Sequence, residues 1–182
     1  MKKSNLKFSA AAVLPAGFRA AGIVAGLKKS RKPDMALFFS DVPAVLAGTF
    51  TTNQVKAATV RLDAERVAKI GVAHGVVVNS GQANACTGKQ GLKDAQAMAV
   101  HAAKQFGVAP ETFLVCSTGR IGVPLRMDVI LPGIEKLAAA VVPNGGESAA
   151  RGIMTTDLVP KRYTATFRAN GRTCRFTGIA KG

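Results

Sequence analysis

The sequence contains no tryptophan and a single tyrosine, Tyr163, and aromatic residues make up 5% of its 182 positions. Proteins that bind single-stranded nucleic acid by stacking need several exposed aromatic side chains, so this composition disfavours that class. No apolar run reaches the roughly 18 residues that a transmembrane helix requires. The glycine-rich phosphate motifs GxxxxGK[ST] and GxGxxG after a strand are also absent, which argues against a nucleotide site of either type.

Cysteine is scarce as well. The three cysteines, Cys86, Cys116 and Cys174, are widely spaced and form no CxxC pair, which disfavours a zinc ribbon and a disulfide scaffold. Such a low cysteine content fits the reducing cytoplasm. Neither Cys86 nor Cys116 stands in a Cys/His signature, so we expect both to be buried, inert thiols.

Acidic residues are few: 10 face 25 basic ones, for a net charge of +15. An excess of this size indicates an acidic or anionic partner. The most basic segment, residues 28–34, is typical either of a nucleic-acid patch or of a solvated turn before a strand, and we favour the turn. Apolar residues make up 48% of the chain, which excludes global disorder and fits one domain over residues 1–182.

Hydrophobic periodicity predicts alternating strands and helices, and therefore a layered α/β fold. The expected strands are Met35–Ser40, Ala44–Thr52, Gly75–Asn79, Phe113–Cys116, Tyr163–Ala169 and Thr173–Ile179, the last two joined by an Asn-Gly hairpin turn. The expected helices are Ala64–Lys69, Leu92–Phe106, Met127–Val142 and Glu147–Met154. His101 falls on the polar face of the second helix, so we expect an exposed histidine there.

Two short polar segments could carry chemistry. Ser117-Thr118-Gly119 follows a predicted strand directly, and a hydroxyl beside a backbone N–H at such a point can form an oxyanion hole. The same residues also suit an ordinary strand-to-loop turn. Thr155-Thr156-Asp157 follows a predicted helix, where its hydroxyls could hold a substrate or cap the next element.

Six segments taken in order are far more specific than either motif. They are GFRAAGIVAGLK, SDVPAVLAGTFTTNQVKAA, VVVNSGQANACTG, VCSTGRIGVPLRMD, IMTTDLVPK and GIAKG. This set resembles the ornithine acetyltransferase / glutamate N-acetyltransferase family of arginine biosynthesis. The resemblance extends from Gly17 to Gly182, nearly the whole chain.

The resemblance implies an enzyme made as a precursor that cuts itself before a threonine. That threonine becomes the N-terminus of a β chain and attacks N-acetylornithine, and the resulting acetyl-enzyme passes its acetyl group to glutamate. An N-terminal threonine can use its own amine as the base. Since the sequence stops at Gly182, straight after a predicted strand, we expect it to be the α chain, without the nucleophile. No cofactor and no metal are expected.

The family's functional residues fall on four positions of this sequence. The oxyanion hole maps onto the Thr118 hydroxyl and the Gly119 backbone N–H, and the substrate contacts map onto Thr155 and Lys181. Three positions depart from the family pattern: Gln82 stands where asparagine is common, Arg120 where an apolar residue is usual, and Leu158 where a hydroxyl is common. None of them removes a residue with an assigned role.

The resemblance further implies a layered α/β fold shared with the β chain, which we expect to be more acidic, in an α2β2 or larger cytoplasmic assembly without membrane or nucleic-acid partners. Residues 1–16 are expected to be a flexible segment. Whether acetyl-CoA also serves as a donor stays open. Two alternatives remain: a self-cleaving aminopeptidase or amidohydrolase with an N-terminal nucleophile, and a basic module that binds a polyanion.

Overall fold

The structure, a computed structural model, describes residues 6–182. Its strands are β1 (Lys7–Ser9), β2 (Phe18–Ile23), β3 (Met35–Val45), β4 (Val72–Gln82), β5 (Phe113–Arg120), β6 (Lys161–Ala169) and β7 (Arg172–Ala180). Its helices are α1 (Ala58–Lys69), α2 (Gly88–Phe106), α3 (Met127–Ala140) and α4 (Gly146–Gly152), with a short 3₁₀ turn η1 (Pro110–Thr112) before β5. None of the described helices is long and apolar enough to cross a membrane.

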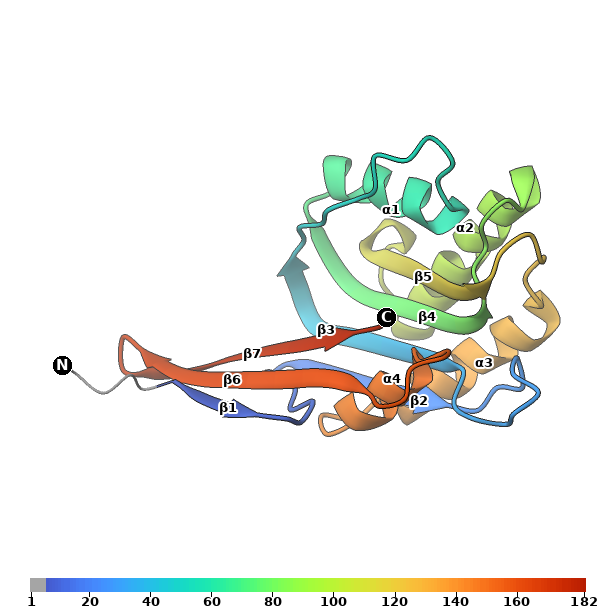
Figure 1. The fold of residues 1–182 in the computed structure, drawn as a ribbon. Helices are drawn as coiled ribbons and strands as arrows, with labels where there is room; N and C mark the ends of the chain where they lie inside the picture. The colour runs from blue at the N-terminus through green and yellow to red at the C-terminus, as the bar shows by residue number, and fades with distance from the viewer. Residues whose placement is uncertain (1–5) are drawn as a thin grey trace.

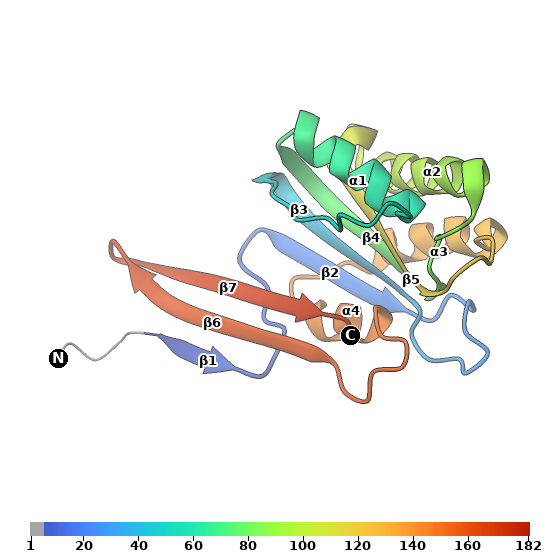
Figure 2. The ribbon, with the colours of Figure 1, turned by 45° about the horizontal axis from the view of Figure 1, so that its top comes forward.

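The centre of the molecule is a four-stranded sheet in the order β2-β3-β4-β5 (Figure 1). Its first two pairings are antiparallel, whereas β4 and β5 run parallel and are connected through α2. Helices α1, α2 and α3 cover one face of this sheet and α4 packs on the other (Figure 2). The molecule is therefore a layered α/β structure, as the sequence predicted. The parallel pair β4 and β5 lies at one edge of its sheet.

Alternate residues of each strand enter two separate cores. Leu37 and Val77 are fully buried against α1–α3, whereas their neighbours Ala36 and Val78 lie on the opposite face with Ala149 of α4. Central strands that are buried on both faces need apolar residues at every position. This requirement accounts for the uninterrupted valine run of residues 76–78.

A second, three-stranded sheet has the order β1-β6-β7, and its hairpin extends well past the first sheet (Figure 1). Asn170 and Gly171 join β6 to β7 with φ angles of +48° and +76°, the positive values that a two-residue type I′ turn requires. Near its carboxyl end β7 returns to the first sheet, where Ile179 packs against the core beside α4. The end of the described chain therefore lies close to the ends of β4 and β5.

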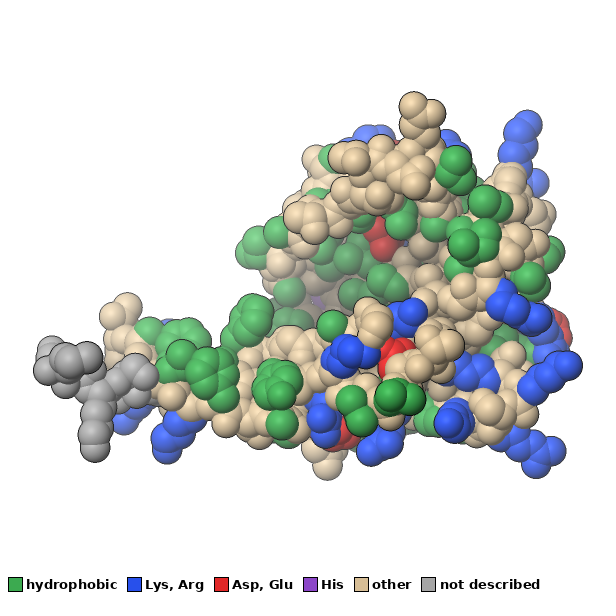
Figure 3. Space-filling view, in the orientation of Figure 1, with side chains coloured by type: hydrophobic (Ala, Val, Ile, Leu, Met, Phe, Trp, Pro, Cys, Tyr) green, Lys and Arg blue, Asp and Glu red, His purple; other side chains and the backbone are tan. Residues whose placement is uncertain are grey.

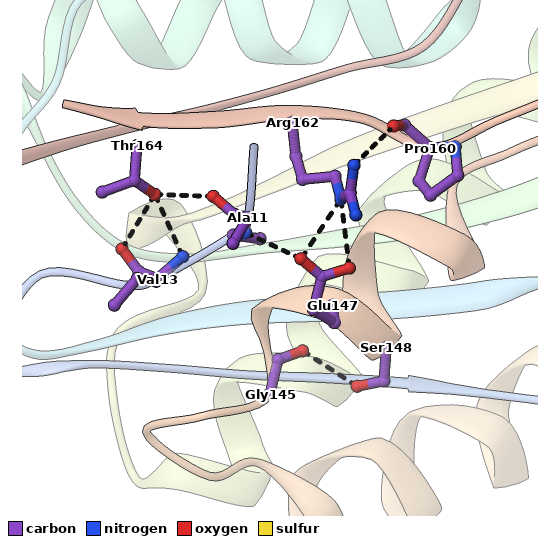
Figure 4. A network of polar contacts seen from close by, with 9 residues as sticks. Ala11, Val13, Gly145, Glu147, Ser148, Pro160, Arg162 and Thr164 are labelled. Carbon is purple, nitrogen blue, oxygen red and sulfur yellow. Dashed lines mark hydrogen bonds and ion pairs between the residues drawn. The ribbon is translucent and has the colours of Figure 1, made fainter. Parts of the chain in front are cut away.

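Polar contacts tie the N-terminal segment to this hairpin and to α4 (Figure 4). Glu147 of α4 accepts the Ala12 N–H at 2.8 Å and pairs with Arg162 of β6 at 3.1 Å. Thr164 of β6 accepts the Val13 N–H at 3.0 Å. These contacts, together with the β1–β6 pairing, fix the chain from Lys7 onward. The first five positions of segment 1–16 lie outside the described residues.

Most of the predicted elements are confirmed. The strands expected at residues 35–40, 75–79 and 113–116 are β3, β4 and β5, and each extends beyond the predicted bounds. The long amphipathic helix is α2, and the helix expected at 127–142 is α3, which contains Pro132 within it. The Asn-Gly hairpin is β6–β7.

One predicted strand was wrong, and strand β2 was not predicted. No separate strand occupies 44–52, because β3 itself continues through a bulge between Phe39 and Ala44 and residues 46–53 have no regular secondary structure. Strand β2 was missed because its sequence is rich in alanine and glycine. The structure explains this composition: a Cβ at Gly22 would lie 1.9 Å from the carbonyl oxygen of Ser148. Only small residues let α4 approach this strand.

Two predictions about side chains were also wrong. Cys86 and Cys116 are exposed, not buried, since Cys86 lies in the loop before α2 and Cys116 on an edge strand. His101 is only 24% exposed, because α3 packs beside α2 and places Glu135 at 3.0 Å from the imidazole Nε2.

Helix α1 is fastened to β5 by two buried charged residues. Asp63 accepts the Val115 N–H at 3.1 Å and Arg66 donates to the carbonyl of Phe113. Burial raises the pKa of Asp63 from 3.8 to about 6, against the opposing effects of the Val115 hydrogen bond and the Arg66 charge. A raised carboxyl pKa stabilises the fold below pH 3.8, and this contribution is lost as the pH rises through about 6.

We therefore expect the free energy of unfolding to fall by about 1 kcal/mol between roughly pH 5 and pH 7.5 through this group alone. Asp63→Asn keeps an oxygen for the Val115 N–H and should abolish that part of the dependence in urea unfolding experiments. Asp128→Asn, at a side chain 70% exposed, is the matched control and should leave it intact. An unchanged pH dependence in Asp63→Asn would show that burial does not raise this pKa.

Candidate functional site

A cavity of about 530 Å³ opens at the carboxyl ends of the parallel strands β4 and β5. Ligands of open α/β sheets commonly bind at this edge, because loops leave the strands in different directions there. The cavity is lined by Lys28, Ser30, Gly81, Thr118, Gly119, Arg120, Thr155, Thr156 and Lys181. All four residues singled out from the sequence, Thr118, Gly119, Thr155 and Lys181, therefore lie around one space.

The wall formed by β5 depends on two glycines. Gly119 has a φ of +133°, and a Cβ at this position would lie 2.3 Å from the carbonyl carbon of Gly81 on β4. Any larger residue would push the two strands apart. The close contact fixes the backbone on which the Thr118 hydroxyl stands, and within residues 6–182 that hydroxyl forms no hydrogen bond.

Buried amide and hydroxyl groups support this wall from below. Asn79 donates to the carbonyl of Gln82 at 2.9 Å and accepts from the Ser117 hydroxyl at 2.6 Å. The side chain of Gln82 accepts the Arg126 N–H at 3.3 Å and so serves the approach to α3. The segment NSGQANA is thus a hydrogen-bonded support for the cavity, and Gln82, the departure from the family pattern, belongs to that support.

The opposite wall is the loop after α4, which is held by one carboxylate. Asp157, whose side chain is only 2% exposed, accepts the Thr155 N–H at 3.0 Å, the Lys161 ammonium at 2.8 Å and the Gly182 N–H at 2.9 Å. Lys161 first, and then the N–H groups of Gly182 and Thr155, hold the pKa of Asp157 well below its usual range. By accepting both N–H groups, the Asp157 carboxylate keeps Thr155 and the Lys181–Gly182 segment at the same rim.

The third wall, the loop between β2 and β3, was not foreseen as part of the site. Asp34 is completely buried, and its carboxylate accepts four backbone N–H groups at 2.6–3.1 Å, those of Ala25, Gly26, Leu27 and Lys28. From this loop the Lys28 ammonium reaches across to the carbonyl of Met154 at 2.5 Å. The basic segment 28–34 is therefore a turn before a strand, and Lys28 is directed inward from it.

Several polar side chains around the cavity have free hydrogen-bonding capacity. Within the described chain, the hydroxyls of Thr155 and Thr156, the Arg120 guanidinium and the Lys181 ammonium form no hydrogen bond or ion pair. Lys28, Arg120 and Lys181 make the lining cationic, and among residues 6–182 no aspartate or glutamate lines it. Such a lining suits a ligand that carries carboxylates.

The described part of the chain holds no group of three or more His, Cys, Asp or Glu side chains placed to bind a metal ion. None of the three cysteines and neither histidine lines the cavity.

Comparison with known proteins gives a consistent result. The model of the ArgJ family matches residues 19–182. The chain is 52% identical over 169 residues to the arginine biosynthesis bifunctional protein ArgJ of Parasynechococcus marenigrum, and 50% identical to the protein of the same name from Caldanaerobacter subterraneus. These alignments cover 92% and 93% of this chain but 41% of each relative, so the chain spans less than half of their length.

Two solved structures share the fold over nearly the full length of both chains. The ArgJ structure from Bacillus halodurans superposes with a TM-score of 0.91 at 36% identity and covers 100% of this chain and 95% of its own. The ornithine acetyltransferase from Mycobacterium tuberculosis, solved with ornithine, gives a TM-score of 0.90 at 38% identity, with 97% and 95% covered. On the family match and the shared fold together, this chain belongs to the ArgJ family.

Proposed function

We propose that this chain is the α subunit of a glutamate N-acetyltransferase that moves the acetyl group from N-acetylornithine to glutamate. The observation that carries the proposal is the convergence of unpaired hydroxyl and cationic groups on the cavity at the ends of β4 and β5. Membership of the ArgJ family supports it, as does the likeness to an ornithine acetyltransferase solved with ornithine.

In this proposal the Thr118 hydroxyl and the Gly119 N–H form the oxyanion hole. The nucleophile, a threonine at the N-terminus of a second chain, attacks the acetyl carbonyl and the carbonyl oxygen becomes negatively charged. Donors held in advance at that position stabilise the charge without having to reorganise. The contact between Gly119 and Gly81 supplies the required rigidity. Ornithine leaves, and the amine of glutamate attacks the acetyl-threonine through a second tetrahedral oxyanion.

Thr155 and Lys181 hold the substrate in this proposal. The Lys181 ammonium suits the α-carboxylate that N-acetylornithine and glutamate share, because a charge-assisted hydrogen bond fixes both position and orientation. Asp157 keeps these two residues on one rim and so sets where the α-carboxylate sits relative to Thr118.

The nucleophile is proposed to lie on a β chain cut from the same precursor. The chain spans 41% of its relatives' length yet covers 95% of one chain in each solved relative, which fits a precursor divided into two chains. One face of the second sheet carries Phe8, Tyr163 and Phe176, which are 71%, 64% and 70% exposed, and hydrophobic side chains gather over the hairpin (Figure 3). An apolar face of this kind suits a permanent partner. We expect that partner to be acidic and the assembly to be α2β2 or larger, in the cytoplasm.

Thr118→Ala in the αβ enzyme should lower kcat by about 10²–10³-fold with little change in KM, because the oxyanion forms only after the ground state. Thr118→Ser keeps the hydroxyl and is the matched control, which should retain activity. The measurement is steady-state transfer from N-acetylornithine to glutamate, repeated with acetyl-CoA as donor. A normal kcat for Thr118→Ala would remove this hydroxyl from the mechanism.

Residues 1–182 produced alone should show no acetyl transfer, since the proposed nucleophile lies elsewhere. The same assay on the αβ product of the full gene is the reference. Turnover by the isolated chain at a comparable rate would contradict the proposal. Release of acetate from N-acetylornithine by the αβ product without transfer to glutamate would identify a hydrolase instead.

Lys181→Met should raise KM for both N-acetylornithine and glutamate by about tenfold to a hundredfold, with a smaller effect on kcat, because the α-carboxylate contact exists in the ground and transition states alike. Lys136→Met, at an exposed position of α3 outside the cavity, controls for the loss of one positive charge. Gel analysis must first establish that the variant is processed. Unchanged KM values in processed enzyme would leave Lys181 as a solvated lysine.

A further inference from the structure

The Lys28 ammonium forms two hydrogen bonds to backbone carbonyls and no ion pair within residues 6–182. Its ammonium donates to the carbonyl of Pro33 at 2.7 Å and to that of Met154 at 2.5 Å. A lysine ammonium carries three N–H groups, so one donor is left over. Lys28 lines the candidate cavity and also an adjoining hollow of about 330 Å³, so open space borders its side chain.

No carboxylate within residues 6–182 forms an ion pair with Lys28. The two nearby acids have their oxygens engaged elsewhere: Asp34 accepts backbone N–H groups, and Asp157 accepts Lys161, Thr155 and Gly182. Burial lowers the pKa of Lys28, partly offset by the more distant charges of Asp34 and Asp157. A half-buried cation without a contacting anion is a costly arrangement in a folded chain, and an anionic ligand would relieve that cost.

The position of this ammonium is also fixed before any ligand arrives. Asp34 holds the backbone N–H of Lys28 at 3.1 Å, and the two carbonyls hold the other end of the side chain. Arg120, the other cation on this lining besides Lys181, is exposed, and its guanidinium forms no hydrogen bond within the described chain. Of Lys28 and Arg120, Lys28 is therefore the cation whose position is fixed in advance. A preorganised donor loses less conformational entropy on binding.

We propose that Lys28 binds the side-chain carboxylate of the acceptor and thereby selects a dicarboxylic amino acid. The inference rests on the proposed function, in which Lys181 takes the α-carboxylate. Glutamate carries a second carboxylate whereas N-acetylornithine carries one, and the cavity offers more cations than a single carboxylate needs. Lys28 is thus a specificity-determining residue for the second half of the reaction.

The test compares glutamate with glutamine as acceptor, because glutamine keeps the shape and loses only the side-chain charge. In the processed αβ enzyme, Lys28→Met and Lys28→Gln should lower the ratio of kcat/KM for glutamate over glutamine by about tenfold to a hundredfold. The loss should appear as a higher KM for glutamate, whereas KM for N-acetylornithine, whose side chain ends in an ammonium, should not rise. Lys28→Arg keeps the charge and should keep most of the preference.

Lys29→Met is the matched control: it removes the same charge from the neighbouring exposed residue, which does not line the cavity, and should behave as wild type. Lys28→Gln retains two N–H donors for the carbonyls of Pro33 and Met154, so it decides the matter if Lys28→Met unfolds. An unchanged acceptor ratio would overturn the proposal. An equal fall in kcat for both acceptors would also overturn it. That result would mean that Lys28 only positions the loop that carries Thr155.

Calorimetric binding of glutamate and glutamine to the same proteins separates this proposal from the proposed function. Wild-type enzyme that binds glutamate more tightly than glutamine but transfers no acetyl group would refute the acetyltransferase and leave the Lys28 site standing. Wild-type enzyme that transfers acetyl groups, with the same preference for glutamate in Lys28→Gln, would refute the Lys28 site alone.

Discussion

The arrangement of the cavity depends on the buried carboxylate of Asp34. A charge removed from water is tolerated only when hydrogen bonds replace its hydration, and here four consecutive backbone N–H groups do so. The loop between β2 and β3 must therefore wrap around this side chain. The carbonyl of Asp34 in turn accepts the Ser80 N–H at 2.7 Å, which sets the loop against the end of β4.

Four segments that are distant in sequence meet at this point, and hydrogen bonds join each to the next. The Ser80 hydroxyl donates to the carbonyl of Gly152 at 2.7 Å, Lys28 donates to that of Met154, and Asp157 accepts the Gly182 N–H. Polar contacts thus build the cavity at the ends of β4 and β5, whereas the two apolar cores pack on the two faces of the sheet. Polar contacts are directional, so they can hold hydroxyl and cationic groups at set positions while leaving the space between them empty.

The sequence predicted the central strands and long helices well because they follow simple periodicities, as in the valine run of β4 and the apolar stripe of α2. Strand β2 escaped because its alanines and glycine reflect the close approach of α4, a tertiary constraint without a local signal. The prediction that Thr118, Gly119, Thr155 and Lys181 belong to one site came from the family resemblance, because no local pattern links residues so far apart. Lys28 escaped because a basic run is normally solvated, and only the carbonyls of Pro33 and Met154 show that this lysine points inward.

The contact between Gly119 and Gly81 bears on how this cavity can be redesigned. Position 119 tolerates no side chain, since the backbone of Gly81 occupies the space, so a mutant library that varies it would yield mostly misfolded protein. Ser30 and Arg120 line the same cavity and are exposed, and their side chains form no hydrogen bonds within residues 6–182. Directed evolution toward other acceptors can instead vary these two positions. Substitutions there change the charge and width of the cavity without disturbing strands β4 and β5.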